Sequence, residues 1–253
     1  MGILTKKRQR RYLAEKEQHW LQELVVFDES GDEKALHRLR LEIKKIRALV
    51  ELAKVQSGKR AAAHFSGLKK MFREAGVIRD AGSQVRYLEE RNLLSNEHKD
   101  QQTRSIQLAA AAFAAHIHRY RKKGKKAVKR LQTDLHPIHA GRILRWYASE
   151  IIETGILLGS TGDELHEARK RIKSMLYVQK VLPKSITKRV RLNTDYLDRL
   201  QEAIGQWHDA VVAIGDWAED NPAAKRVVQQ ECLDNLQEVR MLGEGFYQKV
   251  HTI

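Results

Sequence analysis

One stretch of the sequence recurs 129 residues further along the chain. Residues 36–53, LHRLRLEIKKIRALVELA, align with residues 165–182, LHEARKRIKSMLYVQKVL. The two copies share Leu, His, Arg, Ile and Lys at positions 36, 37, 40, 43 and 44 of the first copy. A repeat of this length indicates that one structural unit occurs twice in the fold.

A second pair of segments has the same offset. Residues 68–81, LKKMFREAGVIRDA, align with residues 197–210, LDRLQEAIGQWHDA, and share Leu, Gly, Asp and Ala. Two separate matches at one spacing are hard to obtain by chance. We therefore expect two homologous halves, residues 1–128 and residues 129–253.

Both halves are expected to be helical. The chain has 42% hydrophobic residues, enough for a packed core, and only three Pro, whereas a β-sandwich needs more Gly and Pro in its turns. Periodicity and chain breaks predict helices at about 5–28, 33–54, 59–79, 82–92, 97–123, 139–158, 163–182, 185–205, 207–219 and 222–250. Short breaks between long helices are typical of antiparallel bundles. The expected fold class is all-α, with two antiparallel helical bundles related by a pseudo-twofold axis.

The first repeated segment carries four basic side chains on one side of its helix. His37, Arg40, Lys44 and Arg47 are spaced by three, four and three residues, so they form one row, the first cationic stripe. This row lies beside the apolar row of the same helix, whereas a merely solvated face would lie opposite to it. The cations are therefore expected at the rim of a groove between helices.

The second copy contains an equivalent row, the second cationic stripe. Its members are His166, Arg169, Lys170 and Lys173. Leu176 stands where the first stripe has Arg47, so the second stripe is one cation shorter. For one stripe alone, a solvated helix face would be the simpler interpretation, and the duplication with His at the same point argues against it. If the halves pack about a pseudo-twofold axis, the two stripes face one basic central pore or groove.

The chain has a large excess of positive charge. Its formal net charge is +15 and its sequence pI is about 9.9. Such an excess favours an anionic partner, such as nucleic acid, a phosphate polymer or an acidic membrane. Residues 1–129 hold 30 Lys and Arg against 15 Asp and Glu, whereas residues 130–253 hold 17 against 17. The first half therefore carries the whole excess.

Two further basic runs are weaker candidates for binding. The run HIHRYRKKGKK, residues 116–126, repeats the stripe spacing with His116, Arg119, Lys123 and Lys126, but Gly124 is able to end the helix within it. We treat Arg119, Lys123 and Lys126 as a second-tier binding site. For the run KKRQRR, residues 6–11, the solvated start of a helix is favoured over a binding arm.

Other residues with reactive side chains are expected to be structural. Asp80 and Asp209, although repeated, are expected to orient a neighbouring Arg or to cap a helix, and no catalytic residue is predicted. His136 and His139 resemble metal ligands in their spacing, but Pro137 interrupts the helix that such a pair needs. We therefore predict neither a metal nor a cofactor.

The sequence has no feature of an exported or membrane-spanning protein. The longest apolar run, LAAAAFAA at residues 108–115, is too short to cross a bilayer and is expected to be a buried helix segment. The segment MGILTKKRQRR lacks the apolar region of a signal peptide and has Lys6 where an acylation motif needs Ser or Thr. The single Cys232 cannot form an internal disulfide. We expect a cytoplasmic protein without a membrane partner.

The paired segments LHxxRxxIKxxR and LHxARKRIK, each followed by G-x-x-[RH]-D, resemble the two halves of a CHAD domain, the conserved-histidine α-helical domain. The resemblance covers most of the chain, with four landmarks in the expected order. It implies a pseudo-symmetric pair of helical bundles around a basic pore that binds inorganic polyphosphate. Carried over by position, the binding residues are His37, Arg40, Lys44, Arg47, His166, Arg169, Lys170 and Lys173.

Three classes of function can be compared on this basis. The expected class is a polyphosphate-binding module that acts as an adaptor, a localiser or a granule-associated protein, because rows of Lys and Arg suit a polymer with about one negative charge per unit. Its affinity is expected to fall as salt or pH rises, since His binds an anion only when protonated. The sequence identifies no protein partner.

The other two classes are an enzyme that makes or cuts polyphosphate and a nucleic-acid binder. The enzyme is disfavoured because the sequence has no glycine-rich phosphate loop, no clustered carboxylates for magnesium and no alternating ExExK pattern. The nucleic-acid binder is disfavoured because the chain shows no recognised motif and only 6% aromatic residues. Sequence-specific binding of nucleic acid is therefore not expected.

Overall fold

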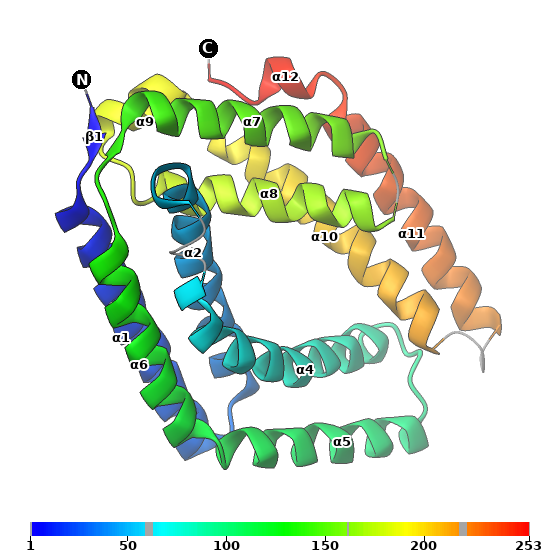
Figure 1. The fold of residues 1–253 in the computed structure, drawn as a ribbon. Helices are drawn as coiled ribbons and strands as arrows, with labels where there is room; N and C mark the ends of the chain where they lie inside the picture. The colour runs from blue at the N-terminus through cyan, green and yellow to red at the C-terminus, as the bar shows by residue number, and fades with distance from the viewer. Residues whose placement is uncertain (1, 59–62, 161, 218–221, 253) are drawn as a thin grey trace. The chain divides into compact units, whose positions relative to one another are not determined.

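The computed structural model describes residues 2–58, 63–160, 162–217 and 222–252, and they are helical nearly throughout (Figure 1). In chain order the elements are β1 (Ile3–Leu4), α1 (Lys6–Ser30), α2 (Glu33–Ser57), α4 (Ser66–Glu89), α5 (Asn96–Ala114), α6 (Ile117–Asp134), β2 (Ile138–His139), α7 (Ala140–Leu158), α8 (Asp163–Gln179), α9 (Lys184–Val190), α10 (Thr194–Trp217), α11 (Pro222–Gly243) and α12 (Phe246–Lys249). The expected all-α fold class is confirmed. No helix within these residues is long and apolar enough to cross a membrane.

The chain divides into two compact units. The N-terminal unit contains residues 4–138, and the C-terminal unit contains residues 139–253 together with residues 1–3. The expected junction of the halves, residue 128, lies inside α6, and the units divide at Ile138. The two short strands β1 and β2, which pair in a two-stranded sheet, contain the positions at which the chain passes from one unit to the other.

In the N-terminal unit, four helices enclose a core. Helices α1 and α2 form a hairpin at Gly31, which ends α1 in a left-handed conformation (φ 67°) that glycine adopts without strain. Helix α2 packs on α4, and α6 packs on both α1 and α4. Leu13, Trp20, Ile43 and Leu68 are fully buried in this core. Helix α5 packs mainly on α4 (Figure 1).

The C-terminal unit repeats this order of helices. Helix α7 packs on α8, α8 packs on α10 and α10 packs on α11, as α1 packs on α2, α2 on α4 and α4 on α5. Subtracting 129 from the bounds of α7, α8, α10 and α11 gives 11–29, 34–50, 65–88 and 93–114, which fall on α1, α2, α4 and α5. The sequence repeat is therefore a repeat of helices and of their packing partners.

Several predicted helix boundaries were wrong because local signals were overruled by packing. Helix α4 continues through the expected break near residues 80–81, and α10 continues past Gly205. Both glycines in the repeated segments, Gly76 and Gly205, lie inside helices against a side chain from the neighbouring helix. The predicted helix start at residue 59 and the predicted helix end at residue 219 lie outside the described residues.

Other helices break where the sequence predicted continuity. The predicted helix 97–123 is interrupted at residues 115–116, where Phe113 and Tyr120 pack their rings 5.0 Å apart and turn the chain between α5 and α6. The predicted helix 185–205 is divided after α9 by Arg191, which adopts a left-handed conformation (φ 52°). Near the end of the chain, Gly245 (φ 64°) separates α11 from α12.

The apolar run at residues 108–115 is not a buried segment. Leu108 is 74% exposed, and within α5 only Ile106 and Phe113 are buried. The prediction failed because alanine-rich runs form stable helices whether or not they are buried. Helix α5 packs mainly on one neighbour, so one narrow side of it is enough to hold it in place.

Candidate functional site

The first cationic stripe lies along α2, beside the row that packs into the core. Leu36, Leu39 and Ile43 of that row are fully buried. His37 and Arg47 are exposed, whereas Arg40 and Lys44, between them, are half-buried. The stripe therefore has two exposed ends and a recessed middle, as expected for cations at the rim of a groove between helices.

Arg40 is held against α4 by main-chain and side-chain contacts. Its Nη1 donates a hydrogen bond to the carbonyl oxygen of Phe72 at 2.9 Å, and its Nη2 lies 3.5 Å from a carboxylate oxygen of Asp80. Its guanidinium carbon lies 4.4 Å from the centre of the Phe72 ring. A Cβ at Gly76 would lie 1.8 Å from Nη1, so only glycine leaves room for this guanidinium. Burial lowers the pKa of Arg40, while Asp80 opposes that shift, and the group stays charged near neutral pH.

Arg169 of the second cationic stripe makes two equivalent contacts in the C-terminal unit, one with a main-chain carbonyl and one with a glycine. Its Nε donates to the carbonyl oxygen of Gln201 at 2.9 Å, and Gln201 is the residue 129 positions after Phe72. A Cβ at Gly205 would lie 2.5 Å from Nη2 of Arg169. The structure thus explains why Arg and Gly recur together in the repeat: each Arg from α2 or α8 fits over a glycine of α4 or α10.

The residue before the repeated Asp differs between the units: it is His208 in the C-terminal unit and Arg79 in the N-terminal unit. In the C-terminal unit, the rings of His166 and His208 stack with their centres 4.0 Å apart, and Nδ1 of His166 is buried without a hydrogen-bond partner. Burial, then His208, lowers the pKa of His166 to about 4, so the ring is neutral at pH 7. The position equivalent to His208 in the N-terminal unit is Arg79, whose Nη1 donates to Asp80 at 2.9 Å.

Among the remaining predicted residues, Lys170 and Arg47 differ in whether they form an ion pair. Lys170 is exposed and forms an ion pair with Glu167 at 2.5 Å. Arg47 is exposed and, in the part of the chain that the structure describes, has no ion pair. Lys173 is half-buried, like Lys44 at the equivalent position. Each stripe thus lies within one unit on one helix, α2 or α8.

The second-tier residues lie on a helix that the sequence expected to end at Gly124. Helix α6 runs from Ile117 to Asp134, with Arg119, Lys123 and Lys126 exposed on it and His116 at its N-cap position. Gly124 lies inside α6 against the buried ring of Trp20, where a Cβ would come within 2.7 Å of the indole. The glycine permits close packing of α1 and α6 and does not end the helix.

Sequence reasoning missed two parts of each site. His208 and Arg79 lie at the variable position of the G-x-x-[RH]-D segment, but neither was included among the predicted site residues. The role of Gly76 and Gly205 was also missed. Asp80 was predicted to orient an Arg or to cap a helix, and its contacts with Arg40 and Arg79 favour the first alternative. In the described ranges, no group of three or more His, Cys, Asp or Glu could hold a metal ion.

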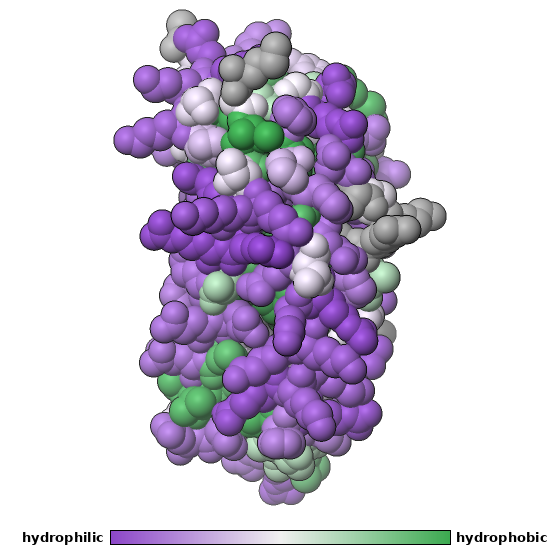
Figure 2. All heavy atoms as spheres, turned by 60° about the vertical axis from the view of Figure 1, so that its left-hand side comes forward, coloured by the Kyte–Doolittle hydropathy of each residue, from purple (hydrophilic) through white to green (hydrophobic). Residues whose placement is uncertain are grey.

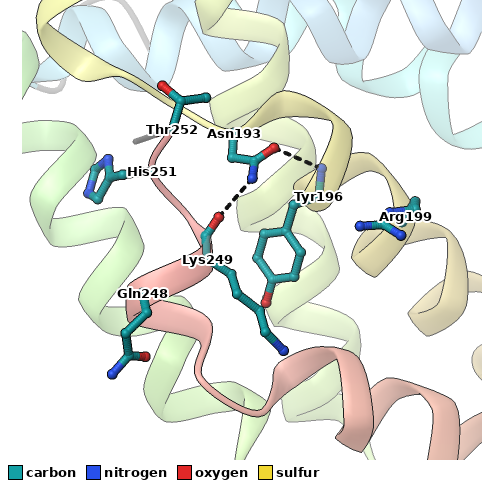
Figure 3. Close-up of a pocket in the computed structure, with 7 residues that line it drawn as sticks. All are labelled: Asn193, Tyr196, Arg199, Gln248, Lys249, His251 and Thr252. Carbon is teal, nitrogen blue, oxygen red and sulfur yellow. Dashed lines mark hydrogen bonds between the residues drawn. The ribbon is translucent and has the colours of Figure 1, made fainter.

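A hollow of about 590 Å³ lies elsewhere in the C-terminal unit (Figure 3). It is formed where the end of the chain crosses the start of α10: Asn193 donates to the carbonyl oxygen of Lys249 at 3.1 Å and accepts from the backbone N–H of Tyr196 at 3.2 Å. Its lining residues are Asn193, Tyr196, Arg199, Gln248, Lys249, His251 and Thr252. None of them belongs to a cationic stripe.

Comparison with known proteins gives two matches. The model of the CHAD domain family matches residues 8–215 of this chain. The fold is similar to the crystal structure of the CHAD domain from the plant Ricinus communis, with a TM-score of 0.69 and 17% sequence identity, over 94% of this chain and 91% of that chain. The comparison with curated proteins finds no match.

Proposed function

This chain belongs to the CHAD domain family, and from that premise we propose that it binds inorganic polyphosphate through its two cationic stripes. The stripes are His37, Arg40, Lys44 and Arg47 on α2, and His166, Arg169, Lys170 and Lys173 on α8. The protein then acts as an adaptor, a localiser or a granule-associated protein in the cytoplasm, and has no catalytic step of its own.

The observation that carries this proposal is that Arg40 and Arg169 are held in equivalent positions in the two units. Each guanidinium is fixed by a 2.9 Å hydrogen bond to a main-chain carbonyl of a neighbouring helix, over a glycine where a Cβ would collide with it. A fixed guanidinium loses little side-chain entropy when an anion arrives, because its position is already set. The same device thus presents a half-buried guanidinium in each of the two units.

The shape of polyphosphate suits rows of cations. It is a flexible chain with about one negative charge per unit and no bases, so it needs cations in a row and no stacking surface. Exposed His37 and Arg47 at the ends of the first stripe can follow such a chain, with Arg40 and Lys44 recessed between them.

The test compares a stripe variant with a matched control. The stripe variant replaces Lys44, Arg47, Lys170 and Lys173 by Gln. The control replaces the exposed cations Lys184, Lys188, Arg226 and Arg240 by Gln, which removes the same charge from residues that belong to neither stripe. We expect the affinity for long-chain polyphosphate at 0.1 M salt to fall by about tenfold or more in the stripe variant only, a difference of ~1.4 kcal/mol. Equal losses in the two variants would mean that net charge, and not the stripes, binds the polymer.

Two further measurements separate the alternatives. Incubation of the protein with labelled polyphosphate and magnesium is expected to leave the chain length unchanged, and shortened or extended chains would show an enzyme. A fluorescent fusion is expected to accumulate on polyphosphate granules and to become diffuse when the four stripe cations are replaced.

A further inference from the structure

The hollow shown in Figure 3 lies within the C-terminal unit. It is lined from α10, from α12 and from the segment that follows α12. Its volume of about 590 Å³ falls in the range of sites that bind small molecules. The position equivalent to Tyr196 in the N-terminal unit is Gly67, where a Cβ would lie 2.8 Å from Ala127 of α6. Helix α6 therefore packs directly on α4 at this position, and the hollow is not part of the repeat.

Main-chain hydrogen bonds hold the backbone around the hollow. The N–H of Asn193 donates to the carbonyl oxygen of Val250 at 2.8 Å, and the N–H of Thr252 donates to that of Arg191 at 2.7 Å. Between these two bonds, His251 pairs with the residue that separates Arg191 from Asn193, in an antiparallel bridge. A site whose backbone is already ordered loses little conformational entropy when a ligand binds. The hollow is therefore preformed, as sites for small molecules usually are.

The neutral polar groups of the lining are largely bonded to one another or to the main chain. The side chain of Asn193 accepts from the N–H of Tyr196 and donates to the carbonyl oxygen of Lys249. The hydroxyl of Tyr196 donates to the carbonyl oxygen of Leu242 at 2.8 Å, and the hydroxyl of Thr252 donates to a carbonyl oxygen at 3.2 Å. Burial raises the pKa of Tyr196 to about 12, so this hydroxyl keeps its proton at neutral pH. These groups shape the hollow, and the charged side chains are left for a ligand.

Three side chains of the lining are cationic or become so on protonation. Arg199 and Lys249 are both exposed, and neither forms an ion pair with any residue that the structure describes. In Figure 3 their side chains lie on opposite sides of the Tyr196 ring. The third is His251, whose Nδ1 lies 3.1 Å from the carbonyl oxygen of Val190. This bond places a proton on Nδ1, and Nε2 becomes a second donor when the ring is protonated beside an anion.

Acidic groups are missing from the described lining of the hollow. Three acids on α10, Asp195, Asp198 and Glu202, are exposed and do not line it, and the first two accept hydrogen bonds from side chains of the same helix. Helix α9, whose last residue contacts the lining, exposes Lys188 and Arg189. Figure 2 brings the side on which α9 lies forward and shows it covered mostly by hydrophilic residues. The lining itself is therefore positively charged and attracts anions.

The charge of the lining favours a phosphate group over other anions. A phosphate monoester carries about two negative charges near neutral pH and has three acceptor oxygens. An arginine donates to two of these oxygens at once, and a lysine adds a further charged contact. A carboxylate carries one charge, so one of the two cations is enough to balance it. Arg199 and Lys249 come from different helices and form no helical row, so they suit a compact group and not an extended polymer.

We propose that this hollow binds a small molecule through its phosphate group, with Arg199 and Lys249 as the charged contacts and His251 as a third. The volume of the hollow leaves room for the body of the ligand beside the phosphate. This proposal does not depend on polyphosphate binding at the stripes. The C-terminal unit then has a ligand site of its own, which the repeat does not supply to the N-terminal unit.

The experiment titrates the protein with inorganic phosphate and with glucose 6-phosphate, a phosphate monoester, at constant ionic strength. Binding is followed by NMR through the side-chain amide of Asn193 and the backbone N–H of Thr252. We expect saturable shifts of both signals with each phosphate probe. Acetate and glucose, used as probes without a phosphate group, are expected to cause no saturable shift.

The site variant is Arg199→Gln/Lys249→Gln, and its charge-matched control is Lys122→Gln/Lys129→Gln, which removes two exposed lysines of α6. The dissociation constant for glucose 6-phosphate is expected to rise about tenfold or more in the site variant and to stay unchanged in the control. Because the replaced side chains are exposed, and Lys and Arg resemble Gln in helix propensity, thermal unfolding is expected to show that both variants fold.

The outcomes separate this proposal from the proposed function. Loss of glucose 6-phosphate binding in the site variant, with polyphosphate affinity retained, supports the hollow as a separate site. The stripe variant, which keeps the hollow intact, is expected to bind glucose 6-phosphate like the parent chain. Equal weakening in the site variant and its control, saturable binding of acetate, or no saturable binding of either phosphate probe would each overturn the proposal. Loss of polyphosphate affinity in the site variant would also overturn it, because the polymer would then be the ligand of the hollow.

Discussion

At the scale of single residues, the two histidines of the repeat differ in exposure: His37 is exposed, whereas His166 is half-buried. His166 lies against His208 and near Lys170 and Arg169, and Glu167 only partly offsets these cations. Burial and this positive surrounding lower its pKa from 6.5 to about 4. His166 is therefore neutral in the free protein at pH 7, although the repeat predicted it as a ligand that binds an anion in its protonated form. A bound polyanion reverses the sign of the local field and raises the pKa of the ring.

This environment makes binding pH-dependent through His166. Because the complex takes up a proton that the free protein lacks, the affinity for polyphosphate is expected to rise as pH falls from 7 towards 5. His166→Gln is expected to flatten this dependence, and His136→Gln, at an exposed position in neither stripe, is expected to preserve it. Calorimetry in buffers of different ionisation enthalpy measures the proton uptake directly. Proton release on binding, or an unchanged slope in His166→Gln, would contradict the assignment.

The same shift affects folding with a definite sign. The unfolded chain takes up a proton at His166 near pH 6.5, while the folded chain takes it up only near pH 4. Stability is therefore lost as pH falls through that window. His208→Gln removes one of the groups that lower the pKa of His166, so we expect the pKa of His166 to rise in that variant, as measured by NMR titration of the imidazole signals.

The sequence predicted which residue types lie on the stripes, but not how they are held. Spacing within one helix is a local property, so the row of His37, Arg40, Lys44 and Arg47 could be read directly. The contact of Arg40 with Gly76 joins residues of two different helices and depends on tertiary packing. No local pattern reports such a contact, and for the same reason Arg79 and His208 were left out of the predicted site.

At the scale of helices, Gly76 and Gly205 make room for Arg40 and Arg169, so substitutions at these glycines test whether the positions of the two arginines affect polyphosphate affinity. Gly76→Ala and Gly205→Ala would place a Cβ at 1.8 and 2.5 Å from guanidinium nitrogens of Arg40 and Arg169. The flexible side chain can move away, so the lost hydrogen bond and the gain of about 1 kcal/mol in helix propensity nearly cancel in the free energy of unfolding. The displaced cation is expected to lower polyphosphate affinity by about fivefold, or ~1 kcal/mol.

A glycine on another helix provides the control. Gly141 lies near the start of α7, and a Cβ there has nothing within 4 Å. Gly141→Ala is expected to leave polyphosphate affinity unchanged and to stabilise the fold by up to about 1 kcal/mol. Urea unfolding and a binding titration on the three variants check both effects. Unchanged affinity in Gly76→Ala and Gly205→Ala would show that the seating of these arginines has no role in binding.

Gly124 is expected to behave in the opposite way. A Cβ at this position would lie 2.7 Å from the ring of Trp20 and 3.2 Å from Leu68, both fully buried. An indole packed inside the core cannot move aside as an arginine tip can. Gly124→Ala is therefore expected to destabilise the protein by about 1–3 kcal/mol despite its better helix propensity. A denaturation midpoint equal to or above that of the parent chain would contradict this account of α1 and α6.

The bounds of the long amphipathic helices were predictable from the sequence, whereas the breaks and connections between several helices were not. The bounds predicted for α1, α2, α7 and α8 lie within about three residues of those observed, because each has a clear apolar row and a turn signal at its ends. The break between α5 and α6 depends on the packing of Phe113 against Phe27 and Tyr120. Gly205, where the sequence predicted a break, lies inside α10 against Arg169 of another helix. Both are tertiary effects that override the local sequence.

At the scale of the whole molecule, the internal repeat made the order of helices predictable from the sequence. The constant offset of 129 predicted two homologous halves, and α7, α8, α10 and α11 pack in the same order as α1, α2, α4 and α5. The charge, in contrast, is not repeated: the excess lies in residues 1–129, and much of it is on α6 and the start of α1. The repeat shows which elements the units share, and the uneven charge shows which surface only the N-terminal unit has.

The two stripes raise a final question of whether one polymer engages both. If it does, the second contact is intramolecular and long-chain polyphosphate binds with one polymer per protein and with an avidity that can exceed each single stripe by 10²–10⁴. We then expect Lys44→Gln/Arg47→Gln and Lys170→Gln/Lys173→Gln each to lower the affinity for long chains strongly. With oligophosphates too short to reach both stripes, each variant loses one binding site and keeps the affinity of the other. Calorimetric stoichiometry distinguishes the cases, because two long polymers bound per parent chain at unchanged affinity would show that the stripes act independently.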